Sequence, residues 1–265
     1  MKKNTLFVTI VILLAVVVVG PLIYFILLGA PANFSDPSIK EHPTNWMGMM
    51  YTGGLLVPIL IGLSIMVVTF VIERWLSLQK AKGRKDLDEF LRKSGKFLDE
   101  KNLDAVMDLC DQQKGSVANI LRAGVSRFKG IQSSQSLSQE EKIEEVKKSL
   151  DEVTMLETPL MEQNLVILST IASIATMVGL LGTVIGMIKA FAALGSSGGG
   201  AAASQLSIAI SEALFNTALG IGTAILAIIF YNFYTTKVDK FMYMIDEASL
   251  NLLESLKTRF ASTTA

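Results

Sequence analysis

The sequence has little of what enzymes and metalloproteins use for chemistry. It contains one cysteine, Cys110, and one histidine, His42, among 265 residues. A single cysteine excludes a disulfide framework within the chain and a thiolate metal cluster, and a single histidine leaves little room for histidine-based metal binding or acid–base catalysis. There is no βαβ pattern, no glycine-rich phosphate loop and no nucleophile motif. We therefore expect no enzyme, no catalytic residues, no metal site and no cofactor, and we interpret Cys110 and His42 as incidental.

Charge is scarce as well. Charged residues make up 18% of the chain, against roughly a quarter in soluble domains. The 24 basic residues balance the 24 acidic ones, so no global field favours a nucleic-acid partner. Hydrophobic residues make up 51%, and the mean hydropathy is +0.47. This composition is typical of a membrane protein.

Four long apolar runs account for this composition. They are Leu6–Leu28, Leu55–Ile72, Gln163–Ile188 and Leu206–Tyr234, and the last of them carries only one charged residue, Glu212. Each run is close to or above the ~18–20 residues that a helix needs to cross a hydrocarbon core. The sequence therefore predicts an all-α membrane protein with four transmembrane helices.

The first run has an alternative interpretation. A basic start, an apolar run and the small residues Ala30-Pro31-Ala32 resemble a secretory signal. The apolar core of such a signal is usually about 7–15 residues, whereas this run has 23. The length favours a retained helix over a cleaved signal.

The basic residues predict the orientation in the membrane, since they are enriched on the cytoplasmic side. Five of them occupy residues 74–85 directly after the second run, and others precede the first run and follow the fourth. Segment 29–54 has one lysine, and segment 190–205 has no charge. We expect both termini and residues 74–162 to face the cytoplasm.

The cytoplasmic part is predicted to be helical. Residues 74–162 hold 32 of the 48 charged residues, and apolar residues recur at spacings of three and four over residues 143–160 and again over 238–256. That spacing predicts two long amphipathic helices, which should bundle with shorter helices from residues 86–129. Pro159 should kink or restart its helix at the membrane. The expected loops are at Gly115-Ser116 and Gln132–Gln139.

The last two apolar runs carry the polar residues of interest. A short loop makes them an antiparallel hairpin, and a rise of 1.5 Å per residue then sets levels across the membrane. The residues placed at common levels are Lys189 with Glu212, Thr183 with Thr217, Thr176 with Thr223, and Ser169 with Asn232. A stripe of hydroxyl groups with one carboxylate near its outer end is what a hydrated ion path requires, because hydroxyls can both donate and accept hydrogen bonds.

Structural explanations compete with this hypothesis. Membrane serine and threonine often bond to their own helix, and Asn216 and Thr223 fall on the Glu212 face, where they could serve only to satisfy that carboxylate. Glu212 could form a structural salt bridge with Lys189. The small residues Gly179, Gly182 and Gly186 are enough to explain close helix packing. We expect this glycine strip to face outward from each subunit, so that repeated contacts close a cyclic homo-oligomer.

The same residues carry a resemblance to a known family. Residues 178–191 (VGLLGTVIGMIKAF), residues 210–220 (ISEALFNTALG) and Tyr231-Asn232 resemble the MotA/TolQ/ExbB proton channel family, most closely its ExbB/TolQ branch. The pattern covers residues 163–233, and Ile72-Glu73-Arg74 is similar to the end of that family's first helix. The family's three-helix core does not include the first run, Leu6–Leu28.

The resemblance implies a function and a site. Family members form a pentamer in the bacterial inner membrane around the single transmembrane helices of an ExbD/TolR-like dimer, whose aspartate carries the proton, and they deliver work to a TonB-like or TolA-like protein. Thr183, Glu212 and Thr217 stand at the family's pathway positions, and Thr176, Asn216 and Thr223 are secondary candidates for lining the pore. Where the family often has prolines, this sequence has Thr176 and Leu226, so we expect straighter helices.

These inferences give a domain organisation and a function. We expect an ExbB-like subunit of a proton-motive-force-driven motor that energises TonB-dependent transport; the alternatives are a TolQ-like or gliding-motor-like stator and a non-conducting membrane scaffold. The expected segments are an N-terminal transmembrane helix or signal-like segment (1–30), a periplasmic segment (31–54), a transmembrane helix (55–73), a cytoplasmic helical domain (74–162), a transmembrane helix (163–189), a periplasmic loop (190–205), a transmembrane helix (206–235) and a cytoplasmic C-terminal helix (236–265).

Overall fold

The fold is helical throughout the part of the chain that the structure, a computed structural model, describes: residues 8–36, 43–133, 137–196 and 200–261. Within these residues the only β feature is an isolated bridge between Phe34 and Pro43. Within the same residues four helices are long and apolar enough to cross a membrane. Three of them contain a whole predicted run, and the fourth, over residues 8–28, contains the described part of the run Leu6–Leu28. The chain is therefore an all-α, multi-pass membrane protein. His42 and the middle of the predicted loop at 132–139 lie outside the described residues.

The chain divides into two compact units, which are described separately. The first consists of residues 1–72 and 166–232, and the second of residues 73–165 and 233–265. The helices α4 (Val57–Lys82) and α10 (Gly200–Ala261) contribute residues to both units. The first unit holds nearly all of the apolar runs, and the second holds most of the charged residues.

The first unit begins with a helix that packs on α4. Over residues 8–28 this helix has wide π-type turns, Leu13–Val19 (η1) and Ile23–Leu28 (η2), on either side of α2 (Gly20–Leu22). The backbones approach closely where two glycines meet, since a Cβ on Gly20 would stand 2.4 Å from the Pro58 carbonyl oxygen and a Cβ on Gly62 would stand 2.8 Å from Val16 Cα. Tyr24 stacks on Tyr51 with ring centroids 4.6 Å apart.

A short structured segment connects this helix to α4. The Asn33 side chain donates to the carbonyl oxygens of Leu27 and Leu28 at 2.9 Å, and Asn45 donates to Asn33 Oδ1 at 2.9 Å. Asn45 also caps α3 (Trp46–Thr52) by accepting from the Gly48 amide. The chain then passes through the short 3-10 helix η4 (Gly54–Leu56) into α4.

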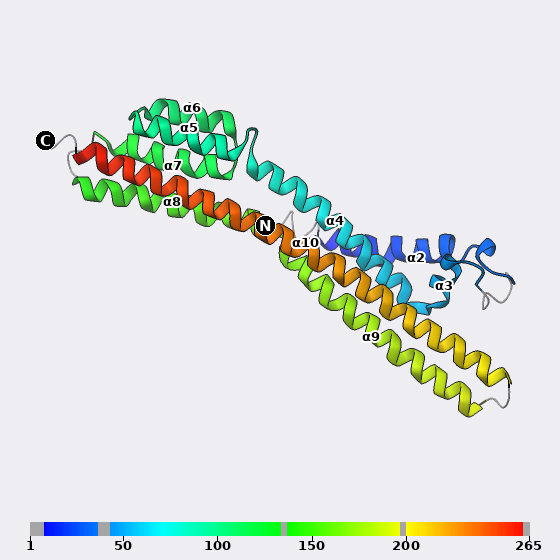
Figure 1. Cartoon of the computed structure of the whole chain (residues 1–265). Helices are drawn as coiled ribbons and strands as arrows, with labels where there is room; N and C mark the ends of the chain where they lie inside the picture. The colour runs from blue at the N-terminus through cyan, green and yellow to red at the C-terminus, as the bar shows by residue number, and fades with distance from the viewer. Residues whose placement is uncertain (1–7, 37–42, 134–136, 197–199, 262–265) are drawn as a thin grey trace. The chain divides into compact units, whose positions relative to one another are not determined.

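The remaining helices of the first unit form a hairpin. The helix α9 (Leu165–Ser196) and the first part of α10 lie side by side, as Figure 1 shows. Neither helix is interrupted at Thr176 or Leu226, the positions where the family often has proline.

The second unit is a bundle of amphipathic helices (Figure 1). It contains α5 (Leu87–Asp99), α6 (Leu103–Gln113), α7 (Ser116–Ile131), α8 (Gln139–Glu162) and the last part of α10. All the apolar residues predicted to line the C-terminal stripe are buried: Val238, Phe241, Ile245, Ala248, Leu252 and Leu256. Gly124 on α7 allows contact with Leu150 on α8 and Leu252 on α10, so the two long helices do bundle with the shorter ones.

Two details of α8 differ from the prediction. Val146 and Leu150 of its apolar stripe are buried, but Leu156 and Leu160 are exposed, because α4 and α10 contact the other side of these turns, at Thr158 and Met161. The helix also continues through Pro159, and the break comes later, at Gln163 and Asn164, where Asn164 has a φ of 61°. Proline removes only one backbone donor, whereas a left-handed residue redirects the chain, and asparagine tolerates that conformation.

The residues at Glu73 and Arg74 do not end a helix, since α4 continues to Lys82. Arg74 is fully buried and donates to both carboxylate oxygens of Glu73, at 2.6 and 2.8 Å. It also donates to the Met161 carbonyl oxygen at 3.4 Å, and Asn164 donates to Glu73 at 3.2 Å. This ion pair therefore ties α4 to the break between α8 and α9.

Candidate functional site

The polar residues of the hairpin lie between two helices that pack in close contact. A Cβ on Gly220 would stand 2.5 Å from the Ala175 carbonyl oxygen, and a Cβ on Gly186 would stand 2.5 Å from Ala213 Cβ. Gly182 faces Asn216 in the same way. The prediction that the strip of Gly179, Gly182 and Gly186 faces outward is therefore wrong. The strip faces α10 of the same chain, because only glycine lets the two backbones approach this closely.

Thr183 on α9 and Thr217 on α10 face each other across this contact. Their hydroxyl oxygens are 3.2 Å apart. The Thr183 hydroxyl is also 2.7 Å from the Leu180 carbonyl oxygen, and the Thr217 hydroxyl is 3.0 Å from the Gly179 carbonyl oxygen. Each hydroxyl has one proton, so two protons serve three possible hydrogen bonds. The pair can therefore redistribute its protons without moving the helices.

Glu212 and Lys189 form an ion pair at the next level. Lys189 Nζ is 2.7 Å from Glu212 Oε1, and the exposed fractions of the two side chains are 53% and 14% respectively. The predicted register thus places both pairs correctly. Gly54 lies against the carboxylate with a φ of +76°, and a Cβ there would stand 2.3 Å from Oε1. The start of η4 is therefore part of the Glu212 site, which the spacing of residues did not reveal.

Asn216 connects α10 to the same turn. Its Nδ2 donates to the Gly53 carbonyl oxygen at 2.7 Å, and the residue is 2% exposed. Its Oδ1 is buried and has no hydrogen-bond partner within the described structure. Asn216 does not bond to Glu212, although the sequence places both on one helix face, because its side chain is turned toward Gly53. This buried acceptor is a feature that the sequence did not predict.

Thr176 and Thr223 are not brought together, although the register puts them at one level. The Thr176 hydroxyl donates to the Ala172 carbonyl oxygen of its own helix at 3.0 Å. Thr223 is buried, bonds to Leu219 of its own helix, and has its hydroxyl 2.6 Å from that of Ser64 on α4. The two secondary candidates therefore face different neighbours. Ser64 was missed because no motif connects it to the last two helices.

An open apolar surface adjoins the threonine pair. Thr183 borders a shallow groove of about 540 Å³ whose other walls are Val184, Met187, Ile188 and Phe191. Ile188 and Phe191 are exposed on this face. A large apolar face beside a hydroxyl group fits contact with lipid or with another apolar helix rather than with bulk water.

Titratable residues provide no metal site here. Among the described residues no group of three or more histidine, cysteine, aspartate or glutamate side chains could hold a metal ion. Cys110 lies in the second unit, buried in α6, and burial raises the pKa of its thiol to about 12. What the hairpin offers chemically is a pair of hydroxyls and one ion-paired carboxylate.

Comparison with known proteins identifies the family. The model of the MotA/TolQ/ExbB proton channel family matches residues 112–247, which is just over half of the chain. The chain belongs to the MotA/TolQ/ExbB proton channel family. The match includes α9, the membrane part of α10 and the Thr183, Glu212 and Thr217 positions. As a member of this family, the chain is of the proton-channel stator type.

Individual relatives come from both branches of the family. The chain is 26% identical over 211 residues to the Tol-Pal system protein TolQ of Pseudomonas aeruginosa, covering 76% of this chain and 87% of that protein. It is 42% identical over 92 residues to the biopolymer transport protein ExbB of Helicobacter pylori, covering 35% of this chain and 62% of that protein. For ExbB of Aquifex aeolicus the identity is 36% over 118 residues, covering 44% and 71%. The match covers 43% of an ExbB-like protein of Synechocystis and 33% of an ExbB homologue of Methanothermobacter thermautotrophicus.

Proposed function

We propose that this family member is an ExbB-like subunit of a motor in the bacterial inner membrane, driven by the proton motive force. Both termini and residues 74–162 lie in the cytoplasm in this proposal, and residues 31–54 and 190–205 lie in the periplasm. The segment boundaries are those predicted from the sequence. The distribution of basic residues supports this orientation.

The observation that carries the proposal is the Thr183–Thr217 pair. Its hydroxyl oxygens are 3.2 Å apart, and each also has a carbonyl acceptor. A hydroxyl can accept a proton on its oxygen as it releases its own proton to the next acceptor, and it is then neutral again. Such groups suit a path through low dielectric, where a bare charge is costly. Thr176, Asn216 and Thr223 have local partners and serve secondary roles in this proposal.

A partner protein supplies the group that carries the proton. Within the last two apolar runs Glu212 is the only charged side chain, and it is engaged by Lys189 at 2.7 Å. The chain thus provides hydroxyls but no unpaired carboxylate in this part of the pathway. This arrangement supports a cyclic homo-oligomer, a pentamer by family resemblance, around the spans of an ExbD/TolR-like dimer that carries the proton on an acidic residue.

The energy available is adequate for mechanical work. One elementary charge crossing 100 mV releases about 2.3 kcal/mol, so several protons can drive a conformational step. The work is delivered to a TonB-like protein and used for transport across the outer membrane. The ExbB relatives, whose identities of 36% and 42% exceed that of TolQ, favour this branch.

A TolQ-like stator is the second candidate, because the TolQ alignment is the longer one and covers 76% of the chain. Affinity purification of the full chain from its native membrane decides between them. Co-purification with a TonB-like protein supports the ExbB assignment, and co-purification with a TolA-like protein contradicts it. A gliding-motor-like stator would bring neither.

Reconstitution tests ion flow itself. Vesicles holding the chain together with its single-span partner should take up protons when a potential is applied, and vesicles holding the chain alone should conduct little. The protein alone should nevertheless purify as a cyclic homo-oligomer. A monodisperse monomer in mild detergent and nanodiscs contradicts the assembly. A complete complex without proton uptake favours the scaffold alternative, in which the Lys189–Glu212 pair only fastens the hairpin.

A further inference from the structure

The second unit contains a groove that takes no part in the proposed function. It lies between the end of α4, the start of α5 and α10, and it has a volume of about 200 Å³. Leu78 and Phe241 are buried in its wall, and Lys82, Lys237 and Lys240 line it. At about 30 Å³ per water molecule, the groove can hold a group the size of several waters.

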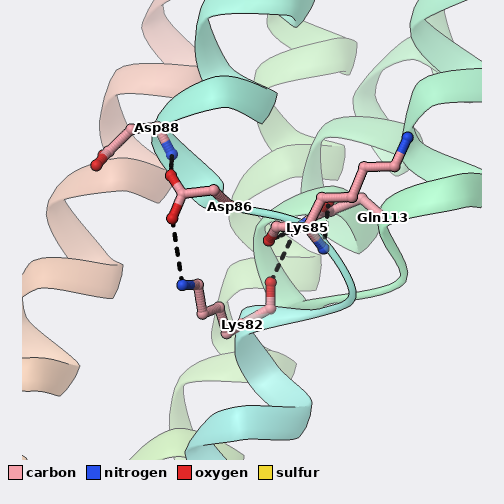
Figure 2. Close-up of polar contacts among 5 residues, drawn as sticks. All are labelled: Lys82, Lys85, Asp86, Asp88 and Gln113. Carbon is pink, nitrogen blue, oxygen red and sulfur yellow. Dashed lines mark hydrogen bonds and ion pairs between the residues drawn. The ribbon is translucent and has the colours of Figure 1, made fainter.

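The corner that shapes the groove is held by a buried glutamine, shown in Figure 2. Gln113 donates from Nε2 to the carbonyl oxygens of Lys82 and Lys85, at 3.0 and 2.8 Å. Its Oε1 accepts from the Lys85 amide at 3.2 Å. Gly83 turns the chain with a φ of +84° and has no room for a side chain, because a Cβ would stand 2.4 Å from the Gln113 carbonyl oxygen. The groove is therefore built on a fixed corner.

Lys82 is fixed at this corner as well. Its Nζ lies 3.3 Å from Asp86 Oδ2, while Asp86 Oδ1 accepts from the Asp88 amide and caps α5, as Figure 2 shows. The hydrogen bond from Lys82 and those from the backbone lower the pKa of the Asp86 carboxyl. The charges of Lys82 and Asp86 thus compensate each other and leave the other lysines to set the charge of the groove.

Lys237 and Lys240 supply a net positive charge. Both are exposed on α10, and among the described residues no ion pair engages either of them. Lys237 Nζ lies 4.5 Å from the centroid of the Phe233 ring. Asp88 is the remaining carboxylate in the lining and offsets one of the two charges. The groove is therefore complementary to a small anion that tolerates a nearby carboxylate.

The position of the groove along the chain selects the kind of anion. Trp75 lies three residues beyond the apolar run that ends at Ile72, and it lines the groove while 49% of its surface is exposed. Lys237 and Lys240 lie three and six residues beyond Tyr234, or about 5–9 Å along the helix. The headgroup layer is about 5–7 Å thick on each side of the hydrocarbon core, so Lys237 lies at its level and Lys240 lies just beyond it. Tryptophan and lysine are enriched at this interface.

We propose that this groove binds the phosphate of an anionic phospholipid, with Lys237 and Lys240 on the headgroup and Trp75 beside the upper acyl chain. Basic pockets between helices at the membrane surface take such headgroups. The apolar wall and Trp75 select a lipid over free phosphate, since free phosphate offers nothing to cover apolar surface. The site requires only that α4 and α10 cross the membrane, so its test is independent of proton coupling.

Tryptophan fluorescence gives the first test. The sequence has two tryptophans, Trp46 and Trp75, so Trp46→Phe leaves Trp75 as the only reporter. The full chain is placed in phosphatidylcholine nanodiscs containing a minor fraction of either brominated phosphatidylglycerol or brominated phosphatidylcholine. We expect much stronger quenching by the anionic lipid. Equal quenching by both lipids would overturn the proposal.

Charge removal gives the second test. We expect Lys237→Gln with Lys240→Gln to reduce the preference for phosphatidylglycerol by about tenfold or more, since each lysine near the surface contributes several-fold. The matched control, Lys80→Gln with Lys85→Gln, removes two charges near the end of α4 from residues that do not line the groove. An equal loss in both double variants would show unspecific attraction and contradict the site. Competition by millimolar inorganic phosphate would point to free phosphate as the ligand and would also contradict it.

Discussion

The ammonium of Lys189 lies 2.7 Å from the carboxylate of Glu212, yet the rest of the chain covers the two side chains to different extents. Lys189 is more than half exposed and Glu212 is mostly covered, with Gly54 against its Oε1. An ion pair with one exposed partner contributes little to stability. The pair therefore does not by itself explain why a carboxylate is kept in a membrane helix, where such a group is costly.

Substituting each partner separately tests this interpretation. We expect Glu212→Gln to abolish most partner-driven transport and Lys189→Met to have a mild effect, because lysine beside an outer loop extends to water in any case. Transport in cells and the amount of assembled complex are the measurements. A comparable loss of complex in both variants would favour a structural salt bridge.

Removing one hydroxyl from the threonine pair should separate function from folding. Thr217→Val keeps the shape of the side chain but removes the donor to the Gly179 carbonyl oxygen. That carbonyl keeps its own helix hydrogen bond, so we expect a stability loss of about 1 kcal/mol or less, normal assembly and no energised transport.

Thr217→Ser is the matched control for this variant, because it retains the hydroxyl and loses only a methyl group. We expect it to keep most of the transport activity. If cells with Thr217→Val transport at the wild-type level, Thr217 is a packing residue and the hydroxyl pathway is wrong.

The close contact of α9 and α10 predicts a difference between two neighbouring glycines. A Cβ on Gly220 would stand 2.5 Å from the Ala175 carbonyl oxygen, whereas a Cβ on Gly222 would meet nothing within 4 Å. We expect Gly220→Ala to push the helices apart and lower stability by about 1–3 kcal/mol. Gly222→Ala should be neutral or slightly stabilising. Thermal unfolding in detergent measures both, and equal effects would contradict the described packing.

The buried thiol predicts a pH effect in the second unit. Burial raises the pKa of Cys110 to about 12, against about 8.5 in an unfolded chain. Below pH 8.5 the thiol is neutral in both states. Above it only the unfolded chain ionises, so the free energy of unfolding falls by up to about 1.4 kcal/mol per pH unit until pH 12.

Comparing the wild type with Cys110→Ala isolates this contribution, since the variant should lose less stability between pH 8.5 and 10. Maleimide labelling gives an independent measurement. We expect the native protein to remain unlabelled at neutral pH and the denatured protein to react fully. Rapid labelling of the native chain would contradict the burial of Cys110.

Much of the fold follows from the sequence. The length of each apolar run determines whether it can cross a membrane, because a helix rises 1.5 Å per residue and must span the thickness of the hydrocarbon core. The same rise sets the register of an antiparallel hairpin, and so Lys189 meets Glu212 and Thr183 meets Thr217. The buried stripe from Val238 to Leu256 was predictable because this helix segment is amphipathic. Its polar face stays in water, so only its apolar face can pack against other helices.

The rotation of each membrane helix about its axis could be decided only by the tertiary structure. The apolar part of α9 has hydrophobic residues on all sides, so no amphipathic stripe indicates which side faces α10, and the glycine strip was placed on the wrong face. The same uncertainty hid the contacts of Ser64 with Thr223 and of Gly53 with Asn216. In these cases steric fit between backbones selects the contact, and steric fit depends on residues far apart in the chain rather than on their spacing.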